Sequence, residues 1–409
     1  MIKKPFLFIF LMACLLLCIC ACGETIFLDE IKMSLDVPEG FAAFYPGHIE
    51  EEEAQDYLFT SAAEEESYLR ENGILMQMIT LDPYCDITVA LVDAYELDDW
   101  NELDYSGFLR LVPLFKAGMQ DSITIRQAKA YFTNQARYIL IDGTVQAEEY
   151  SFDSRQYMKY QDKKVIMINC RVYPGITIQT EALIQHVIDS IWYDGVEPFV
   201  GQAIFTGEKG DKNVISLDGF SLSLPNGWQE DTSFQTGYNK FINGTMLLLL
   251  SSQDIWSYLS PSEKEILKRE DCSLLPYLRG MDIEEYRAFV DEKEKSFEAT
   301  STSTMKGLLS ETGVASEIFP AELLSLPITC TLEFDGGILS DFPGEPFILY
   351  AGKSVASGEN DAAIVRIVQD AYLYHNFHNG CSNTIQVYGH LSEKAKEEIS
   401  ALINTIEYR

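Results

Sequence analysis

The sequence predicts an α+β fold made of two tandem α-β-α sandwich domains, each with a mostly antiparallel sheet and a C-terminal amphipathic helix. Two observations predict this fold. Two short motifs in the first half of the chain recur in the second half, and strand-like segments follow one another directly, with helical patterns at the ends of each half. The length of 409 residues also suits two domains, since single cores seldom exceed about 250–300 residues.

The first repeated motif is an alternating strand that ends in a turn. Ser34–Phe41 has the sequence SLDVPEGF, and Ser221–Trp228 has the sequence SLSLPNGW. In both copies apolar residues alternate with polar ones before a Pro-x-Gly turn and an aromatic residue, which is the pattern of a half-buried strand. We therefore expect each domain to open with the same strand. Its apolar face would hold Met33, Leu35 and Val37 in the first copy and Phe220, Leu222 and Leu224 in the second.

The second repeated motif is a strand followed by an amphipathic helix. Val172-Tyr173 near the end of the first half corresponds to Val387-Tyr388 near the end of the second. The helix that follows carries apolar residues at i, i+3, i+4 and i+7, which form one stripe on a helix surface. These residues are Ile184, Val187, Ile188 and Ile191 in the first copy and Ile399, Leu402, Ile403 and Ile406 in the second.

These repeats set the expected domain limits. The first domain covers 22–195, a linker rich in glycine and charge covers 196–212, and the second domain covers 213–409. The second copy is the longer one in its middle, where we expect a helical insertion near 256–305. Ser260–Glu263 in this stretch has the sequence SPSE, which combines an N-cap serine, a proline at the first helical position and a glutamate three residues after the cap.

The N-terminus has the pattern of a secretory signal peptide. Lys3 and Lys4 precede the mainly apolar run 5–21, and residues 1–21 are therefore set apart from the fold. The last residues of the leader, Ile19-Cys20-Ala21-Cys22, resemble the lipobox of bacterial lipoproteins. That resemblance implies that Cys22 is the lipid attachment site. An uncleaved transmembrane anchor remains an alternative, and both interpretations place the body of the chain outside the cytoplasm.

Charge and cysteine content exclude several kinds of partner and site. The chain has 63 acidic and 30 basic residues, and its formal net charge of −33 argues against nucleic acid as a partner. Five cysteines lie in the body without a CxxC pair, which fits neither a dense disulfide framework nor a zinc motif. One disulfide among the last three of them and free buried thiols both remain open. The five are Cys85, Cys170, Cys272, Cys330 and Cys381.

At this point the chain resembles a known family. Its units open with a strand that runs into Pro-x-Gly and an aromatic residue, and they close with a helix of the form Ile-x-x-(Val/Leu)-Ile-x-(Ser/Thr)-Ile. Such units resemble the PsbP-like α-β-α sandwich, over residues 28–193 and 215–408. They are also similar to uncharacterised lipoproteins of anaerobic Gram-positive bacteria. The resemblance implies an accessory or assembly role and transfers no catalytic residue.

Three kinds of segment contain residues that could form a catalytic or metal site. His375–Cys381 contains two histidines and a cysteine that could bind zinc, but its Asn379-Gly380 pair favours a hairpin turn. Ser303–Lys306 matches the SxxK motif of penicillin-recognising enzymes, but the partner motifs are missing, so we expect a flexible connector. The acidic runs Glu50–Glu53 and Glu64–Glu66 lack calcium-loop spacing and predict solvated helix faces or loops. We therefore predict no catalytic residue, no metal site and no cofactor.

The leading functional hypothesis is a non-enzymatic, lipid-anchored binding or accessory protein on the extracytoplasmic face of the cell membrane. Its partners would be the membrane, through the lipid anchor, and a protein of the cell envelope. A cell-envelope hydrolase and a small-ligand-binding lipoprotein are the alternatives. Two facing carboxylates with raised pKa values in a deep polar pocket would favour the hydrolase. A broad exposed aromatic patch would favour a protein partner, and a closed cleft would favour a small ligand.

Overall fold

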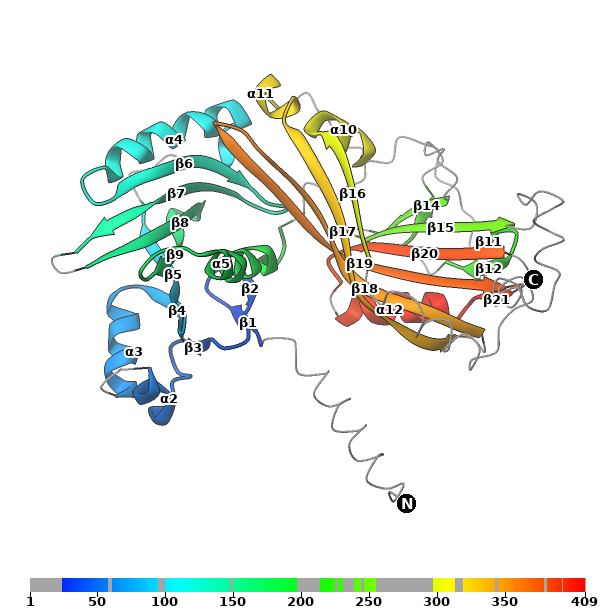
Figure 1. Ribbon diagram of the computed structural model, residues 1–409, viewed down its shortest axis with the longest axis horizontal. Coiled ribbons are helices and arrows are strands. Elements are labelled where there is room, and N and C mark those ends of the chain that lie inside the picture. The colour runs from blue at the N-terminus through cyan, green and yellow to red at the C-terminus, as the bar shows by residue number, and fades with distance from the viewer. Residues whose placement is uncertain are drawn as a thin grey trace, which may run out of the picture. The chain divides into compact units, whose positions relative to one another are not determined.

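A computed structural model of the chain describes residues 24–57, 61–94, 100–147, 150–196, 214–224, 227–230, 239–243, 246–254, 297–312, 319–342, 345–378, 381–391 and 393–408 (Figure 1). The fold divides into two compact units. Unit 1 comprises Met1–Val196 with two short later pieces, Ile318–Pro320 and Asn360–Ile364, and unit 2 comprises the rest. The predicted domain limits, 22–195 and 213–409, stay predictions.

Unit 1 is built on an antiparallel sheet with the strand order β3-β4-β5-β9-β8-β7-β6. Hairpin connections join β4 to β5 and β6 through β9 in turn, whereas the β5–β9 pair joins segments far apart in sequence. The predicted α+β class with a mostly antiparallel sheet is confirmed. The strands are β3 (Ala42–Phe44), β4 (Ile74–Leu81), β5 (Tyr84–Asp93), β6 (Thr124–Phe132), β7 (Arg137–Gln146), β8 (Ser151–Gln161) and β9 (Lys164–Val172).

Helices cover both faces of this sheet. Ile87 packs with Ile188 of α5 in one apolar core, whereas Ala90, on the opposite side of the same strand, packs with Leu69 of α3 in another. Phe132, opposite Tyr131, packs on Phe108 of α4, on the same face as α3. A small sheet, β1-β2-β10, lies with α5. The elements are α2 (Glu51–Asp56), α3 (Ala62–Glu71), the 3-10 turn η1 (Trp100–Glu102), α4 (Tyr105–Met119), α5 (Ile178–Ser190), β1 (Thr25–Leu28), β2 (Met33–Asp36) and β10 (Trp192–Tyr193).

Helix α5 forms as its sequence pattern predicts. The Thr177 side chain accepts a hydrogen bond from the Thr180 backbone N–H, and the Thr180 side chain in turn caps Thr177, so the first turn is closed by a capping box. The predicted stripe is buried at Ile184, Val187 and Ile188. These residues pack against the apolar side chains of β4, β5 and β9, which explains why the helix lies along this face.

A network of ion pairs around the buried Asp142 also connects α5 to the sheet. Arg155 of β8 donates from Nη1 to Glu181 of α5, 2.6 Å away, and from Nη2 to Asp142 of β7, 2.8 Å away. Arg126 of β6 donates to the other oxygen of Asp142. Because both oxygens of one buried carboxylate receive a guanidinium, the three strands and the helix share one charge-compensated network.

Unit 2 has a sheet with the strand order β13-β14-β15-β20-β19-β18-β17-β16, and a small sheet β11-β12-β21. Its helix α12 buries Ile399, Leu402 and Ile403 against Leu248, Val387 and the side chains of β12. The elements are β11 (Val214–Ser216), β12 (Phe220–Ser223), β13 (Gln229–Glu230), β14 (Asn239–Asn243), β15 (Met246–Asp254), β16 (Phe297–Thr304), α10 (Met305–Thr312), α11 (Ala321–Leu324), β17 (Pro327–Phe342), β18 (Glu345–Glu359), β19 (Ala363–His378), β20 (Cys381–Gly389), α12 (Glu393–Ile403) and β21 (Glu407–Tyr408).

The two units share one strand order. Strands β13-β14-β15-β20-β19-β18-β17 follow the same sequence of connections as β3-β4-β5-β9-β8-β7-β6, and β11-β12-β21 follows β1-β2-β10. Helix α12 stands before β21 as α5 stands before β10. Strand β16 is the addition in unit 2. This agreement is what the predicted repeat requires, but Pro225 of the second motif lies outside the described residues, and the repeat stays a prediction.

The predictions for 256–305 and for Ser303–Lys306 need correction. Residues 255–296 lie outside the described residues, but Phe297–Thr304 forms β16, paired antiparallel with β17, so the helical insertion is wrong there. The flexible connector is also wrong, because Ser303 and Thr304 end β16 and the buried Met305 begins α10. The physical reason is the run of β-branched threonines, which favours a pleated strand over a helix or coil.

The strands on both sides of the predicted Asn379-Gly380 turn fit a hairpin. Strand β19 ends at His378 and β20 begins at Cys381, and these two residues are partners in the antiparallel register. Asn379 and Gly380 themselves lie outside the described residues. Across the part of the chain that the structure describes, helices are too short or too polar to cross a bilayer.

The buried stripe of α5 gives a direct test of the fold. Ile188→Ala should lower the free energy of unfolding by about 2–4 kcal/mol, because Ile188 is only 2% exposed and its loss leaves a cavity. Ile178→Ala, on the same helix at a side chain that is 93% exposed, should change it by less than about 0.5 kcal/mol. Urea unfolding of both variants measures the difference, and equal effects would contradict the packing of α5.

Candidate functional site

An aromatic hollow opens on unit 1 where β5 and β8 begin and β9 ends. Its volume is about 560 Å³. The rings of Tyr150 and Tyr173 lie edge to face, with centroids 6.2 Å apart and planes at 83°. The ring centroid of Phe152 also lies 6.2 Å from that of Tyr150. We call this hollow the aromatic pocket, and its described lining residues are Tyr84, Tyr150, Phe152, Arg171, Val172 and Tyr173.

Strand register brings these distant residues together. Asp86 of β5 is the direct partner of Arg171 of β9, and Arg171 is the direct partner of Ser154 of β8. Because side chains alternate between the faces of a strand, Asp86 and Arg171 point to the face that α3 covers, away from the α5 core. Directly after β9, the Tyr173 backbone N–H donates to the carbonyl oxygen of Tyr84, 3.3 Å away.

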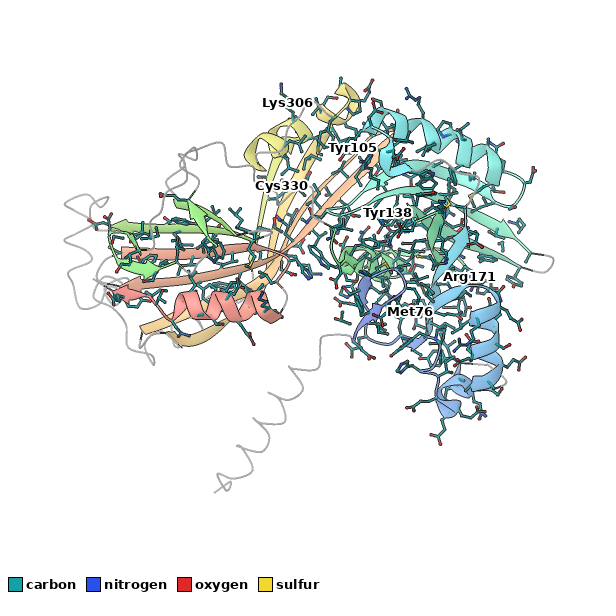
Figure 2. All side chains as sticks on the ribbon, turned by 180° about the vertical axis from the view of Figure 1, so that it is seen from behind. Met76, Tyr105, Tyr138, Arg171, Lys306 and Cys330 are labelled. Carbon is teal, nitrogen blue, oxygen red and sulfur yellow. The ribbon has the colours of Figure 1, made fainter. Side chains whose placement is uncertain are left out.

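Arg171 is held by a buried carboxylate. Its Nη2 donates to Oδ2 of Asp86, a side chain that is only 2% exposed. Figure 2 labels Arg171 in unit 1. Gln77 Nε2 donates to the other carboxylate oxygen of Asp86, at 3.1 Å. Burial raises the pKa of Asp86, while the Arg171 charge and these hydrogen bonds oppose the rise. The guanidinium is therefore fixed in place beneath the pocket, and its charge is compensated from below.

A second carboxylate, Glu65, is buried above this pair. Glu65 belongs to α3 and is 3% exposed, because it lies one turn before Leu69 on the face that packs against the sheet. Burial, followed by the nearby charge of Asp86, raises the pKa of Glu65 to about 7. The predicted solvated face is therefore wrong for Glu65, although its neighbour Glu64 is exposed.

Unsatisfied polar atoms gather on the same face of the sheet. Among the described residues, buried atoms without a hydrogen-bond partner include Glu65 Oε1, Gln77 Oε1, Gln156 Oε1 and Arg171 Nε. The register aligns Gln77, Thr88, Asn169 and Gln156 as one row across β4, β5, β9 and β8, next to the Asp86–Arg171 row. Each buried unpaired polar atom costs about 1–3 kcal/mol, so such a concentration marks a region shaped by more than stability.

The two facing carboxylates bear on the hydrolase alternative. Glu65 and Asp86 both have raised pKa values, as the hydrolase would require. Both are almost fully buried, however, and Asp86 is engaged by Arg171 and Gln77. The described lining of the aromatic pocket contains no carboxylate. The described lining can therefore stack rings and donate hydrogen bonds, but it offers no acid–base pair.

The structure does not bring the predicted site residues together here. Cys22 lies outside the described residues, and His375–His378 belongs to β19 in unit 2. No group of three or more potential metal ligands occurs among the described residues, and the predicted lack of a metal site stays a prediction. Cys85, Cys170, Cys330 and Cys381 are free thiols, and Cys272 lies outside the described residues.

Sequence reasoning missed the aromatic pocket and the buried pair beneath it. One signal was available. Asp86 interrupts the start of an apolar strand, and Arg171 interrupts the end of another, Val165–Val172. Charged residues inside apolar strands are seldom buried without a partner of opposite charge, so the two could have been paired. The tyrosines of the pocket gave no such signal, because Tyr84, Tyr150 and Tyr173 are far apart in the sequence and belong to no binding motif.

No family model matches the chain, and no curated protein matches it by sequence. Three solved structures show similarity. The solution structure of cyanobacterial PsbP (CyanoP) from Synechocystis sp. PCC 6803 is 9% identical, with 42% of this chain and 93% of that chain covered and a TM-score of 0.28. A protein from Bacteroides thetaiotaomicron is 11% identical, with 84% and 88% covered and a TM-score of 0.25. The immunity protein TplEi of Pseudomonas aeruginosa is 8% identical, with 95% and 97% covered and a TM-score of 0.16. These similarities assign neither a family nor a function.

The raised pKa of Glu65 predicts a pH-dependent stability. The folded state keeps the Glu65 proton up to about pH 7, whereas the unfolded chain releases it near 4.5, so the contribution of Glu65 is complete below pH 4.5 and is lost as the pH rises through 7. Relative to Glu65→Gln, the wild type should lose about 1–3 kcal/mol of unfolding free energy over this interval. Urea unfolding at a series of pH values measures the difference. The control Glu64→Gln, at an exposed position, should show the same pH dependence of the unfolding free energy as the wild type. The prediction is contradicted if Glu65→Gln also shows the wild-type pH dependence.

Proposed function

We propose that this chain is a lipid-anchored, extracytoplasmic and non-enzymatic accessory protein with tandem PsbP-like domains, which docks a protein partner of the cell envelope at the aromatic pocket of unit 1. The observation that carries the proposal is the pocket itself. It places three exposed tyrosines, Tyr84, Tyr150 and Tyr173, around one fixed arginine, Arg171.

The composition of the pocket supports a protein partner. Tyrosine and arginine are enriched in the residues that carry most of the binding energy at protein interfaces. Tyr150 is 57% exposed, although its ring offers a large apolar surface. Exposed Tyr68 and Leu81 add further apolar surface on α3 and at the end of β4. A cluster of such side chains on one unit is typical of an interaction surface.

The leader and the charge of the chain support the location. A lipid on Cys22 would tether the body, and two acyl chains anchor a protein stably where one would be marginal. The net charge of −33 favours a soluble body that stays away from anionic surfaces. The docking surface would then work in the space just outside the membrane.

A cell-envelope hydrolase is the second candidate, and the raised pKa values of Glu65 and Asp86 favour it. A hydrolase would need these carboxylates to reach a substrate. Their burial beneath α3 and the engagement of Asp86 by Arg171 count against that role. The accessory function is therefore the stronger of the two.

Lipid attachment can be tested directly at Cys22. Cells that express the chain are labelled with an alkyne analogue of palmitate, and the purified protein is analysed by mass spectrometry of its N-terminus. The wild type should carry label and begin at Cys22, whereas Cys22→Ala should remain unlabelled and keep its leader. Cys20→Ala, two residues earlier, is the matched control and should be labelled normally. A wild-type chain that retains residues 1–21 would instead establish the transmembrane anchor.

Docking at the pocket can be tested in intact cells by a photo-crosslinking amino acid at position 150. A discrete crosslinked product with an envelope protein is expected, and it should decrease at least several-fold when Tyr84→Ala and Tyr173→Ala are added. The control places the crosslinker at Leu114 on α4, a side chain that is 67% exposed and not part of the pocket lining. Identical products from positions 150 and 114, or no product from position 150, would refute docking at the pocket.

A further inference from the structure

We propose that the aromatic pocket recognises an extended, proline-containing peptide segment in the polyproline II conformation. This inference rests on the proposed docking function and names the chemistry of the docked segment. It is carried by three features of the pocket: its exposed aromatic rings, the hydrogen-bond donors among its polar groups and the compensated charge of Arg171.

The aromatic side chains of the pocket offer exposed ring surface on which an apolar ring can pack. Tyr150 and Tyr173 meet at 83°, while Tyr150 and Phe152 are inclined by 35°. The two tyrosine rings are in edge-to-face contact with each other, and both side chains are at least half exposed, so the outer surface of each ring remains open to a ligand. Proline-rich segments bind in grooves lined by aromatic side chains, and they lose little entropy there because the polyproline helix is already formed.

The polar groups of the pocket match a backbone that only accepts hydrogen bonds. Proline has no backbone N–H, so a proline-containing segment presents mainly carbonyl oxygens. Arg171 can only donate. The hydroxyl of Tyr84 can donate, since a tyrosine hydroxyl is protonated at neutral pH, and burial and the charge of Asp86 raise its pKa further. Tyr150 and Tyr173 supply two more hydroxyls.

The charges of the pocket and of the whole chain restrict the charge of the recognised peptide. Asp86 compensates Arg171 from below, so the pocket does not require an anionic ligand. The net charge of −33 repels an acidic segment. The favoured segment is therefore neutral or basic. Its length follows from the volume of about 560 Å³, which suits a few residues. Polyproline II has three residues per turn, so two prolines three positions apart would face the rings together.

The experiment selects peptides from a phage-displayed library of random sequences against the full chain. Peptides selected by the wild type should be enriched at least several-fold in Pro-x-x-Pro and depleted in acidic residues, relative to the input library. The Tyr150→Ala/Tyr173→Ala variant should not enrich them, while Leu114→Ala, outside the pocket, should. Both variants are first compared with the wild type in thermal melting, and exposed side chains are not expected to change the melting temperature.

Synthetic peptides from the selection then give affinities by fluorescence anisotropy. Replacement of both prolines by alanine, or Tyr150→Ala in the protein, should weaken binding about tenfold or more. Tyr173→Phe keeps the ring and removes the hydroxyl, so it should weaken binding less than Tyr173→Ala.

Several results would overturn the inference. They are selection without proline enrichment, selection of acidic peptides, equal selection by the Tyr150→Ala/Tyr173→Ala variant, and binding of neutral oligosaccharides that depends on Tyr150 in place of peptides. If the position-150 crosslink forms in cells while proline-containing peptides fail, the docking function stands and the peptide class is wrong. If both fail, the docking function itself is wrong.

Discussion

The buried ion pair between Asp86 and Arg171 is the constraint on which the site depends. Taking two charges out of water is costly, and the cost is recovered only when the geometry and the remaining hydrogen bonds are good. Here Gln77 completes the shell of Asp86 from β4. The pair also opposes a slip of β9 against β5, since a shift of one residue would move Arg171 to the apolar α5 face. The same register places the residues that line the aromatic pocket.

One sheet thus serves two different faces. Toward α5, the strands present an apolar core, in which Tyr138 and Tyr193 pair their buried hydroxyls, and the Asp142–Arg155 ion pair, which extends to Glu181 of the helix. Toward α3, the strands present the Asp86–Arg171 row and a row of uncharged polar side chains, with Glu65 above them. The first face supplies stability. The second face is less stabilising, because it contains buried polar atoms without hydrogen-bond partners. It ends at the exposed tyrosines of the aromatic pocket. This distribution is expected where a binding surface is maintained at a cost in stability.

The spacing of apolar residues in the sequence predicted the elements whose formation depends mainly on that spacing. The stripe of Ile184 and Ile188, the alternating strand at Leu35 and the α+β class all follow from the spacing of apolar residues. The β-branched threonines of β16 favour a strand, but a Ser/Thr-rich segment is also typical of a connector, and the pairing with β17 that decides between the two is not visible in the local sequence. The acidic neighbours of Glu65 favour an exposed position for the whole run, so its burial is not visible in the sequence. The aromatic pocket depends on the β5–β9 register, which sequence periodicity does not specify.

The most direct test of this account is a double-mutant cycle on the unfolding free energy, with Asp86→Asn, Arg171→Met and the combined variant. Each single change should lower the free energy of unfolding by about 2–4 kcal/mol. Asp86→Asn leaves the one-third exposed guanidinium of Arg171 without its counter-charge, and Arg171→Met leaves the buried carboxylate of Asp86 without its own. The combined variant should cost less than the sum of the two by about 1–3 kcal/mol. Additive effects within about 0.3 kcal/mol would show that Asp86 does not hold Arg171, and the account of the pocket would then be wrong.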